Sequence, residues 1–276
     1  MPVRNKSRFW QDWSTIDFAR ADLGRTIALL PVAATEQHGP HLPVSVDARI
    51  NAALVARTLE RLPGKFPILV LPMQHVGVSP EHGDFPGTLS VSAETMIRLM
   101  TEIGQGVAAA GIGRLVLFNS HGGQPQILDI VAQRLRAERN LLTFPINAYR
   151  FWRAEDHFPA EEGQHGIHAG AVETSIMLHI DAGQVRRGAI KNFPSLSRAM
   201  AKKYKHLRPF GRTGSFGWQM QDLNRDGAAG DARLATAAIG RKLIDQAASQ
   251  IAELLQEIAA MPQVLPAKGR RRRTRS

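Results

Sequence analysis

The sequence contains no cysteine, few aromatic residues and no long apolar stretch. Without cysteine, the chain can form no disulfide, thiolate nucleophile, iron–sulfur cluster or cysteine-bound zinc site. Its longest apolar run, residues 27–34, contains a proline and is far shorter than the roughly 20 residues that span a bilayer. We therefore expect no membrane segment, and any metal must be bound by histidine, aspartate and glutamate.

Length and composition fit a folded globular protein. The 276 residues are 43% hydrophobic and 21% charged, which suffices for one sizeable core. The formal net charge is +11, but six of the positive charges lie in the last nine residues. We expect a single domain over residues 1–262 and a basic, disordered tail over residues 263–276. Residues 1–18 lack the apolar stretch of a secretory signal, which predicts a cytoplasmic protein.

Short apolar runs alternate along the chain with stretches of helical spacing. The runs predict strands at residues 27–30, 68–71, 115–118 and 142–146. Helices are expected at residues 48–62 after Asp47 as N-cap, 93–110 after Ser92, 126–138 and 231–260. This alternation predicts an α/β fold with a mostly parallel sheet covered by helices. Residues 193–230 are rich in glycine and proline without a clear period, and we expect a loop-like insertion that serves as a flap or an oligomer contact.

Polar side chains follow the first and third predicted strands. Glu36, His38 and Asp47 come after the first strand, and His121 follows the third, ahead of two glycines. Because ligands bind beyond the carboxyl ends of strands in open α/β sheets, we expect these side chains to share one rim. Carboxylate and imidazole together suit zinc, iron or manganese, and a bridging carboxylate can hold two ions. A lone Glu-x-His is more often an ordinary loop, but His121 at a second strand end favours a metal site.

A third polar group lies between His165 and Ser175 and leads into an apolar helix. His168 falls in a glycine-rich turn, the type of flexible loop where a proton donor often lies. Glu173 stands near the helix start, where it would either complement the helix dipole or serve the site. Both uses of Glu173 remain open.

Other candidates carry weaker signals. Glu81, His82 and His75 follow the second strand and are predicted to line the pocket rather than to bind metal. Trp152, after the fourth strand, would either cover a flat heterocyclic substrate or pack in the core. His41 is expected to support the ligands from behind. We interpret the remaining candidates as exposed or structural histidines: His157, His179 and His206.

Taken together, these segments resemble the creatininase (creatinine amidohydrolase) family. The resemblance rests on residues 36–43 with Asp47, residues 119–123 and residues 168–175, with a further segment at residues 85–90. They follow one another in the family's order and spacing over residues 25–250. The resemblance implies a three-layer α/β/α fold and two divalent ions, Zn, Mn or Fe. It further implies hydrolysis of a C–N bond in a cyclic or small amide or a formamide, often by a homo-oligomer.

The resemblance also implies metal ligands. Glu36, Asp47 and His121 are expected to bind one ion, and Asp47 is expected to bridge to a second ion bound by His38. Creatininase itself has a metal-binding glutamate two residues after the histidine that matches His121, where the present chain has Gly123. Glu173, already named above, is the nearest candidate to replace that glutamate.

A role in catalysis and substrate binding is implied for three further residues. His168 matches a position near the family's substrate, and we expect it to donate a proton or to hold an oxyanion. His82 and Trp152 are expected to contact the substrate. The nucleophile would be a water activated by the metal ions.

Three alternatives stay open. Other branches of the family resemble deformylases of pyrimidine intermediates or the peptidase that trims the mycofactocin precursor, so a related peptidase is one alternative. Another dinuclear-metal hydrolase that cleaves an ester or carbon–carbon bond is the second. The third is a nucleic-acid-associated protein that binds phosphates through the arginine tail. The sequence carries no base-reading module, so we expect only nonspecific contacts of the tail with nucleic acid.

Overall fold

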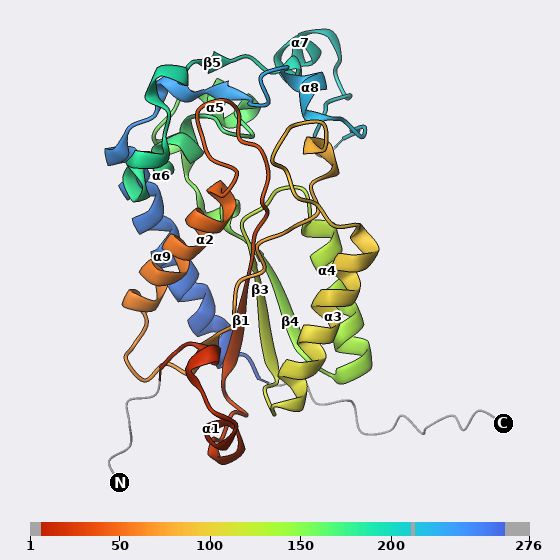
Figure 1. Ribbon diagram of the computed structural model, residues 1–276, viewed down its shortest axis with the longest axis vertical. Helices are drawn as coiled ribbons and strands as arrows, with labels where there is room; N and C mark the ends of the chain where they lie inside the picture. Colours follow the sequence, from red (N-terminus) through yellow and green to blue (C-terminus); the bar gives the residue numbers. More distant parts are fainter. Residues whose placement is uncertain (1–6, 211–212, 263–276) are drawn as a thin grey trace, which may run out of the picture.

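The computed structural model describes residues 7–210 and 213–262, and its centre is a parallel sheet (Figure 1). The strands are β1 (Ile27–Val32), β2 (Ile68–Val70), β3 (Arg114–Asn119) and β4 (Leu142–Asn147), in the order β2-β1-β3-β4. All three pairings are parallel. The predicted strands are therefore confirmed, with ends that differ by a residue or two.

Helices cover both faces of the sheet. One layer holds α2 (Val46–Arg61), α6 (Ala171–Ile180) and α9 (Ala237–Ala260), and the other holds α3 (Ala93–Ala109) and α4 (Pro125–Arg139) (Figure 1). This arrangement confirms the three-layer α/β/α fold. No helix within residues 7–210 and 213–262 is long and apolar enough to cross a membrane.

The core explains why the strands are apolar throughout. Side chains alternate along a strand, so Ile27 and Leu29 pack into the core with α2, α6 and α9. Ala28 and Leu30 point to the other face and pack with α3 and α4. Because both faces are buried, every residue of β1 is buried, as in other parallel sheets enclosed by helices.

One predicted helix start is confirmed, and two differ from the prediction. Ser92 caps α3 as expected, with its side chain accepting a hydrogen bond from the amide of Thr95. Asp47 is not an N-cap, because α2 begins at Val46 and places Asp47 in its first turn. The carboxylate of Asp47 instead faces His38 and His121. The last helix begins at Ala237 rather than at residue 231, since Thr236 caps it.

The segment 193–230 is more regular than its composition predicts. It contains α7 (Leu196–Lys203) and α8 (Met220–Leu223), and its ends meet where β5 (Asn192–Phe193) pairs with β6 (Gly230–Asp231). The expectation of a loop was therefore wrong in this part, because Ser195 caps a helix and the antiparallel pair closes the segment. The predicted tail, residues 263–276, lies outside the described residues.

Short elements complete the chain. Two further α-helices are α1 (Thr15–Arg20) and α5 (Ala160–His165). Single 3-10 turns lie at Trp10–Asp12, Pro80–His82, Ala148–Phe151, Ala154–Asp156, Ala182–Gln184, Arg187–Ala189 and Ala232–Leu234.

A close helix contact fixes the element that carries Glu173. A Cβ at Gly240 in α9 would overlap the backbone carbonyl of Ser175 in α6, so only glycine permits this approach. The Ser175 hydroxyl also accepts a hydrogen bond of 3.1 Å from the Thr236 amide, just before α9. The packing of α9 therefore determines where the first turn of α6 lies.

Candidate metal centre

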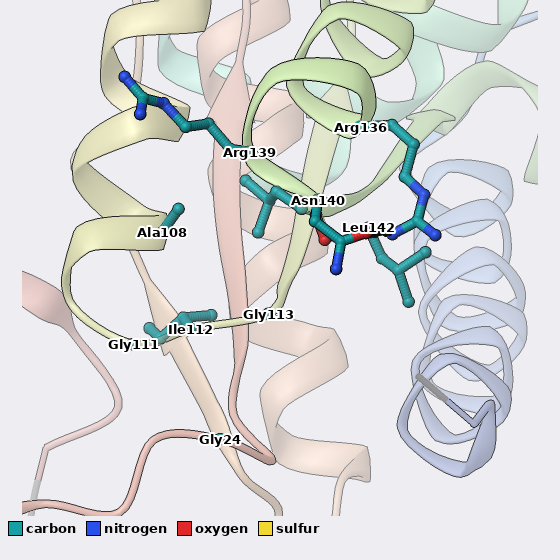
Figure 2. Close-up of a pocket in the computed structure, with 10 residues that line it drawn as sticks. Gly24, Ala108, Gly111, Ile112, Gly113, Arg136, Arg139, Asn140 and Leu142 are labelled. Carbon is teal, nitrogen blue, oxygen red and sulfur yellow. Dashed lines mark hydrogen bonds between the residues drawn. The ribbon is translucent and has the colours of Figure 1, made fainter. Parts of the chain in front are cut away.

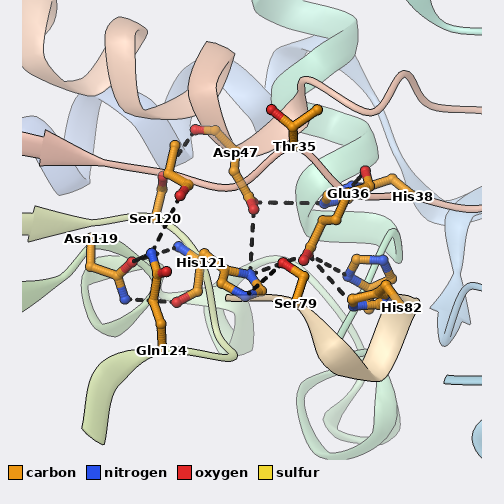
Figure 3. A network of polar contacts seen from close by, with 12 residues as sticks. Thr35, Glu36, His38, Asp47, Ser79, His82, Asn119, Ser120, His121 and Gln124 are labelled. Atoms are coloured by element: carbon orange, nitrogen blue, oxygen red, sulfur yellow. Dashed lines mark hydrogen bonds and ion pairs between the residues drawn. The ribbon is translucent and has the colours of Figure 1, made fainter. Parts of the chain in front are cut away.

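Buried carboxylates and imidazoles converge at the carboxyl ends of β1 and β3 (Figure 3). His121 Nδ1 lies 3.2 Å from Glu36 Oε1 and 3.5 Å from Asp47 Oδ2. The other oxygen of Asp47 lies 3.7 Å from His38 Nε2. Asp47 therefore stands between His38 and His121, which is the place that a bridging ligand would take.

Backbone carbonyls orient the imidazoles from behind. His38 Nδ1 donates to the carbonyl of Glu36 at 3.0 Å, and His121 Nε2 donates to the carbonyl of Val78 at 2.9 Å. Because a neutral imidazole carries one N–H, the opposite nitrogen of each ring presents a lone pair to the centre. Metal-binding histidines in proteins are oriented in the same way.

Three polar atoms of the centre have no hydrogen-bond partner in the described structure. They are Glu36 Oε2, His38 Nε2 and Asp47 Oδ2, and all three are buried. A buried polar atom without a partner costs about 1–3 kcal/mol, and more when it is charged. Divalent cations bound at this centre would satisfy all three, so the residues present fit a metal site.

The charges of the centre favour a cation. Burial would raise the pKa of Glu36, but His121, His82 and His168 hold it well below its usual value. Burial would lower the pKa of His121, but Glu36 and Asp47 raise it well above normal. The Glu36 carboxylate is therefore ionised, and His121 takes up a proton where it faces Glu36. A divalent ion would replace that proton, so metal binding should release protons.

Glu173 lies beside His38 and Asp47, and these three side chains offer ligand atoms within 4.8 Å of one another. Its Oε2 also accepts a hydrogen bond of 2.5 Å from the amide of Ala169. Burial and the charge of Asp47 raise the pKa of Glu173 to about 7, against the opposing effect of His38. Glu173 thus binds the turn before α6, and its use as a metal ligand beside His38 and Asp47 stays a prediction.

Glu81 comes closer to the centre than its expected place on the pocket wall. It belongs to a second group of possible ligands, with Glu36 and His121. Glu81 Oε1 lies 3.8 Å from His121 Nε2, the nitrogen that faces away from Asp47. A Cβ at Gly123 would overlap Glu81 Oε1, so the carboxylate of Glu81 fills the space that a longer side chain at Gly123 would take.

His168 reaches the centre from the turn before α6. Two backbone hydrogen bonds with Ala229 hold this turn, at 3.3 and 2.8 Å. The Nε2 of His168 donates to the carbonyl of Gln37 at 2.8 Å, and its Nδ1 lies 3.9 Å from Glu36 Oε1. Burial lowers the pKa of His168 well below normal, so the ring is neutral. Its nitrogen toward the centre can therefore accept a proton, whereas the expected donor role requires the opposite tautomer.

His82 completes the group around Glu36. Its Nε2 lies 3.6 Å from Glu36 Oε1, and its ring centroid lies 4.4 Å from that of His168. Burial lowers the pKa of His82 to about 4, so this ring is also neutral near pH 7. The predicted place of His82 beside the ligands thus agrees with the geometry, while contact with a substrate stays a prediction.

The remaining candidates lie at different depths. His41 Nε2 hydrogen-bonds to Thr174 Oγ1 at 2.9 Å, one residue from Glu173, which is the supporting place expected of it. Trp152 packs, partly buried, against the apolar core, and its predicted contact with a substrate stays a prediction. The other histidines are exposed at 75, 179 and 206, and half-buried at 157 and 165.

No pattern in the sequence predicts a role for Gln37 or Glu162. Gln37 lies inside the motif and contacts both His82 and His168. Glu162 is buried, and its two oxygens accept the amides of Ala171 and Asp231, each at 2.7 Å. This carboxylate joins the turn before α6 to β6. The sequence feature that could have indicated this role is a set of three glycines, because a side chain on any of them would overlap the Glu162 carboxylate. They lie at positions 166, 170 and 230.

Comparison with known proteins shows the family of this chain. The profile of the creatininase family, described as creatinine amidohydrolase, matches residues 11–255. The mycofactocin precursor peptide peptidase of Mycobacterium ulcerans is 33% identical over 233 residues, covering 81% of this chain and 84% of that protein. Creatinine amidohydrolase of Pseudomonas putida is 29% identical over 188 residues, covering 61% and 68%.

Solved structures share the fold. A crystal structure of creatinine amidohydrolase superposes with a TM-score of 0.74 at 23% identity, covering 93% of this chain and all of that one. A creatininase structure described with Mn superposes with a TM-score of 0.73 at 24% identity, covering 92% and 99%. The fold and the relatives define a metal-dependent amidohydrolase. More narrowly, the chain belongs to the creatininase family.

Proposed function

We propose that this protein hydrolyses a C–N bond of a small or cyclic amide with two divalent ions, Zn, Mn or Fe. Glu36, Asp47 and His121 would hold the first ion, and His38, Asp47 and Glu173 the second. The observation that carries the proposal is the set of buried, unpartnered atoms on Glu36, His38 and Asp47. Each lies where a lone pair points at a shared centre, which a cation would fill.

The chemistry at this centre follows from the neutral imidazoles. When bound, two divalent ions supply a water nucleophile at neutral pH and polarise the amide carbonyl. His168 Nδ1 then accepts a proton from the attacking water as the C–O bond forms. The same proton passes to the leaving nitrogen as the C–N bond breaks. His168 thus remains the catalytic residue, acting first as a base.

A peptide substrate is the second candidate. It is favoured because four mycofactocin precursor peptidases match 81–85% of the chain, whereas the creatinine amidohydrolase matches 61%. A screen of metal-loaded protein against cyclic amides, formamides and short peptides separates the two. Turnover of peptides alone would replace the small-amide proposal. A homo-oligomer in the cytoplasm is also proposed, and sedimentation of the purified protein tests the assembly.

Metal analysis of the Glu173→Gln variant tests the second ion. The wild type should bind close to two divalent ions per chain, and Glu173→Gln should retain only the ion bound by Glu36 and His121. The amide at this position removes the charge but keeps the shape of the side chain. Glu81→Gln is the matched comparison, because Glu81 touches the rear of His121. Two ions in Glu173→Gln and one in Glu81→Gln would move the ligand role to Glu81.

A further inference from the structure

Gln37, the residue between Glu36 and His38, is buried and has a fixed amide orientation. Its Oε1 accepts a hydrogen bond of 2.9 Å from the amide of Gly39. Its Nε2 donates to the carbonyl of Gly227 at 2.8 Å. Because one backbone donor and one backbone acceptor bind opposite ends of the amide, exchanging its oxygen and nitrogen would break both bonds.

The second hydrogen of this amide determines the tautomer of His82. Gln37 Nε2 lies 2.7 Å from His82 Nδ1, and an NH₂ group can only donate. His82 Nδ1 must therefore be the unprotonated nitrogen. The ring hydrogen is then on Nε2, which lies 3.6 Å from Glu36 Oε1 and faces the centre.

This makes His82 different from the other imidazoles at the centre. His38, His121 and His168 each donate to a backbone carbonyl from behind and turn a lone pair toward the carboxylates. His82 accepts from behind and turns an N–H toward the same place. Where a metal ion replaces the proton between imidazole and carboxylate, one donor thus stands among three acceptors around the Glu36 and Asp47 carboxylates.

We propose that His82 is the hydrogen-bond donor of the active site, that its N–H binds the substrate's amide oxygen, and that Gln37 is the positioning residue that sets its tautomer. This inference rests on the proposed hydrolase function. Negative charge develops on the amide oxygen as water attacks, and a donor held in place stabilises that charge. Because Nε2 carries the ring hydrogen, the site selects an oxygen acceptor at this point. His82 is accordingly no metal ligand.

The tautomer can be measured without any substrate. In full-length protein labelled with ¹⁵N-histidine and loaded with Zn²⁺, NMR should show His82 with a protonated Nε2 and an unprotonated Nδ1. The His82→Gln variant identifies the signals by their loss. Gln37→Met, which removes the amide, should change the His82 tautomer equilibrium. The matched control is Gln124→Met, because Gln124 is also a buried amide but binds Asn119 and Val78. A protonated Nδ1 on wild-type His82 would overturn the proposal.

Activity and metal content give the second test. His82→Leu should keep the wild-type metal content and lose about 10²–10³ in kcat, the usual cost of removing one such donor. His82→Gln should recover part of that loss, since its side-chain NH₂ can reach forward as Nε2–H does. Loss of metal in His82→Leu would make His82 a ligand and overturn the proposal. If no amide is cleaved by the wild type but the tautomer is as stated, the hydrolase function fails while the assignment of the donor stands.

Discussion

The two ends of the central sheet are built in opposite ways. At the amino ends of the strands lies an open cavity of about 320 Å³, lined by glycines and by exposed groups such as Arg139 (Figure 2). At the carboxyl ends, Glu36 and Asp47 are each only 2% exposed and face buried imidazoles. The amino end offers volume without convergent chemistry, and the carboxyl end offers convergent chemistry in a tight space. Unpartnered buried atoms therefore locate the site better than cavity size does.

Removing the carboxylate of Asp47, which faces both candidate ion sites, should change metal content and turnover more than any other variant proposed here. Asp47→Ala should lose both metal ions and lower turnover by about 10³-fold or more, since bound ions supply several kcal/mol of transition-state stabilisation. Arg139→Ala at the amino-end cavity is the matched control and should keep both metal content and rate. Elemental analysis and kinetics on the same preparations measure the two effects. Full metal occupancy in Asp47→Ala would remove Asp47 from the bridge.

A variant at His168 tests whether this residue takes part in catalysis or in metal binding. His168→Ala should keep its fold and its metals yet lose turnover by about 10²–10⁴, the range for general acid–base catalysis. Metal content and rate are compared in one variant once a substrate is known. A fall in metal affinity would make His168 a ligand, in line with its group of possible ligands that includes Glu36 and His38. An unchanged rate would leave it structural.

The buried imidazoles should make stability depend on pH, and His41 gives a clean case. Burial lowers the pKa of His41 to about 4, from an ordinary value of 6.5. Between these values the unfolded chain binds a proton and the folded chain does not, so acidification favours unfolding. His41 thus contributes up to about 3 kcal/mol above pH 6.5, and this is lost as the pH falls to 4. Urea unfolding of metal-free protein at several pH values should show a shallower slope for His41→Gln. The exposed His206→Gln serves as control, and equal slopes in His41→Gln and wild type would refute the assignment.

Glu162 should have the smallest of these effects, because it supports the rim of the centre from outside. In Glu162→Gln an amide nitrogen faces one of the two backbone amides that the carboxylate now accepts. An unsatisfied buried donor costs about 1–3 kcal/mol, so the free energy of unfolding should fall by that amount. Denaturant titration measures it, with the exposed Glu155→Gln as control. A loss below 0.5 kcal/mol, the usual scale of surface changes, would contradict the role.

The two ends also differ in how far the sequence predicts them. Strand and helix periodicity located the sheet to within a residue or two, because burial on both faces leaves a continuous apolar run. The same reasoning placed Glu36, His38, Asp47 and His121 on one rim, since parallel strands end there together. Their roles as ligands remain predictions, although the geometry brings all four together.

What the sequence did not show depends on contacts between distant segments. Gln37 donates a hydrogen bond to His82, which lies 45 residues further along the sequence. Glu162 accepts one from a backbone amide 69 residues further along. Neither has a local pattern, because a single hydrogen bond leaves no periodic trace. Asp47 was misplaced as an N-cap for a related reason. Aspartate at a helix start is usually a cap, so the sequence predicted both a cap and a metal ligand at Asp47, and the facing imidazoles show that its carboxylate does not serve as the cap.

The segment between β5 and β6 has a consequence for how such enzymes diversify. Its ends are tied down by the strand pair and by the bond between Ala229 and His168. None of the proposed metal ligands lies inside it, so its helices are free of the constraint that coordination places on the rest of the rim. Residues 194–226 can therefore be exchanged, lengthened or redesigned as a cassette, provided that Gly227 and Ala229 still hold Gln37 and His168. A chimera that carries a relative's cassette would change which substrates enter while keeping the catalytic machinery intact.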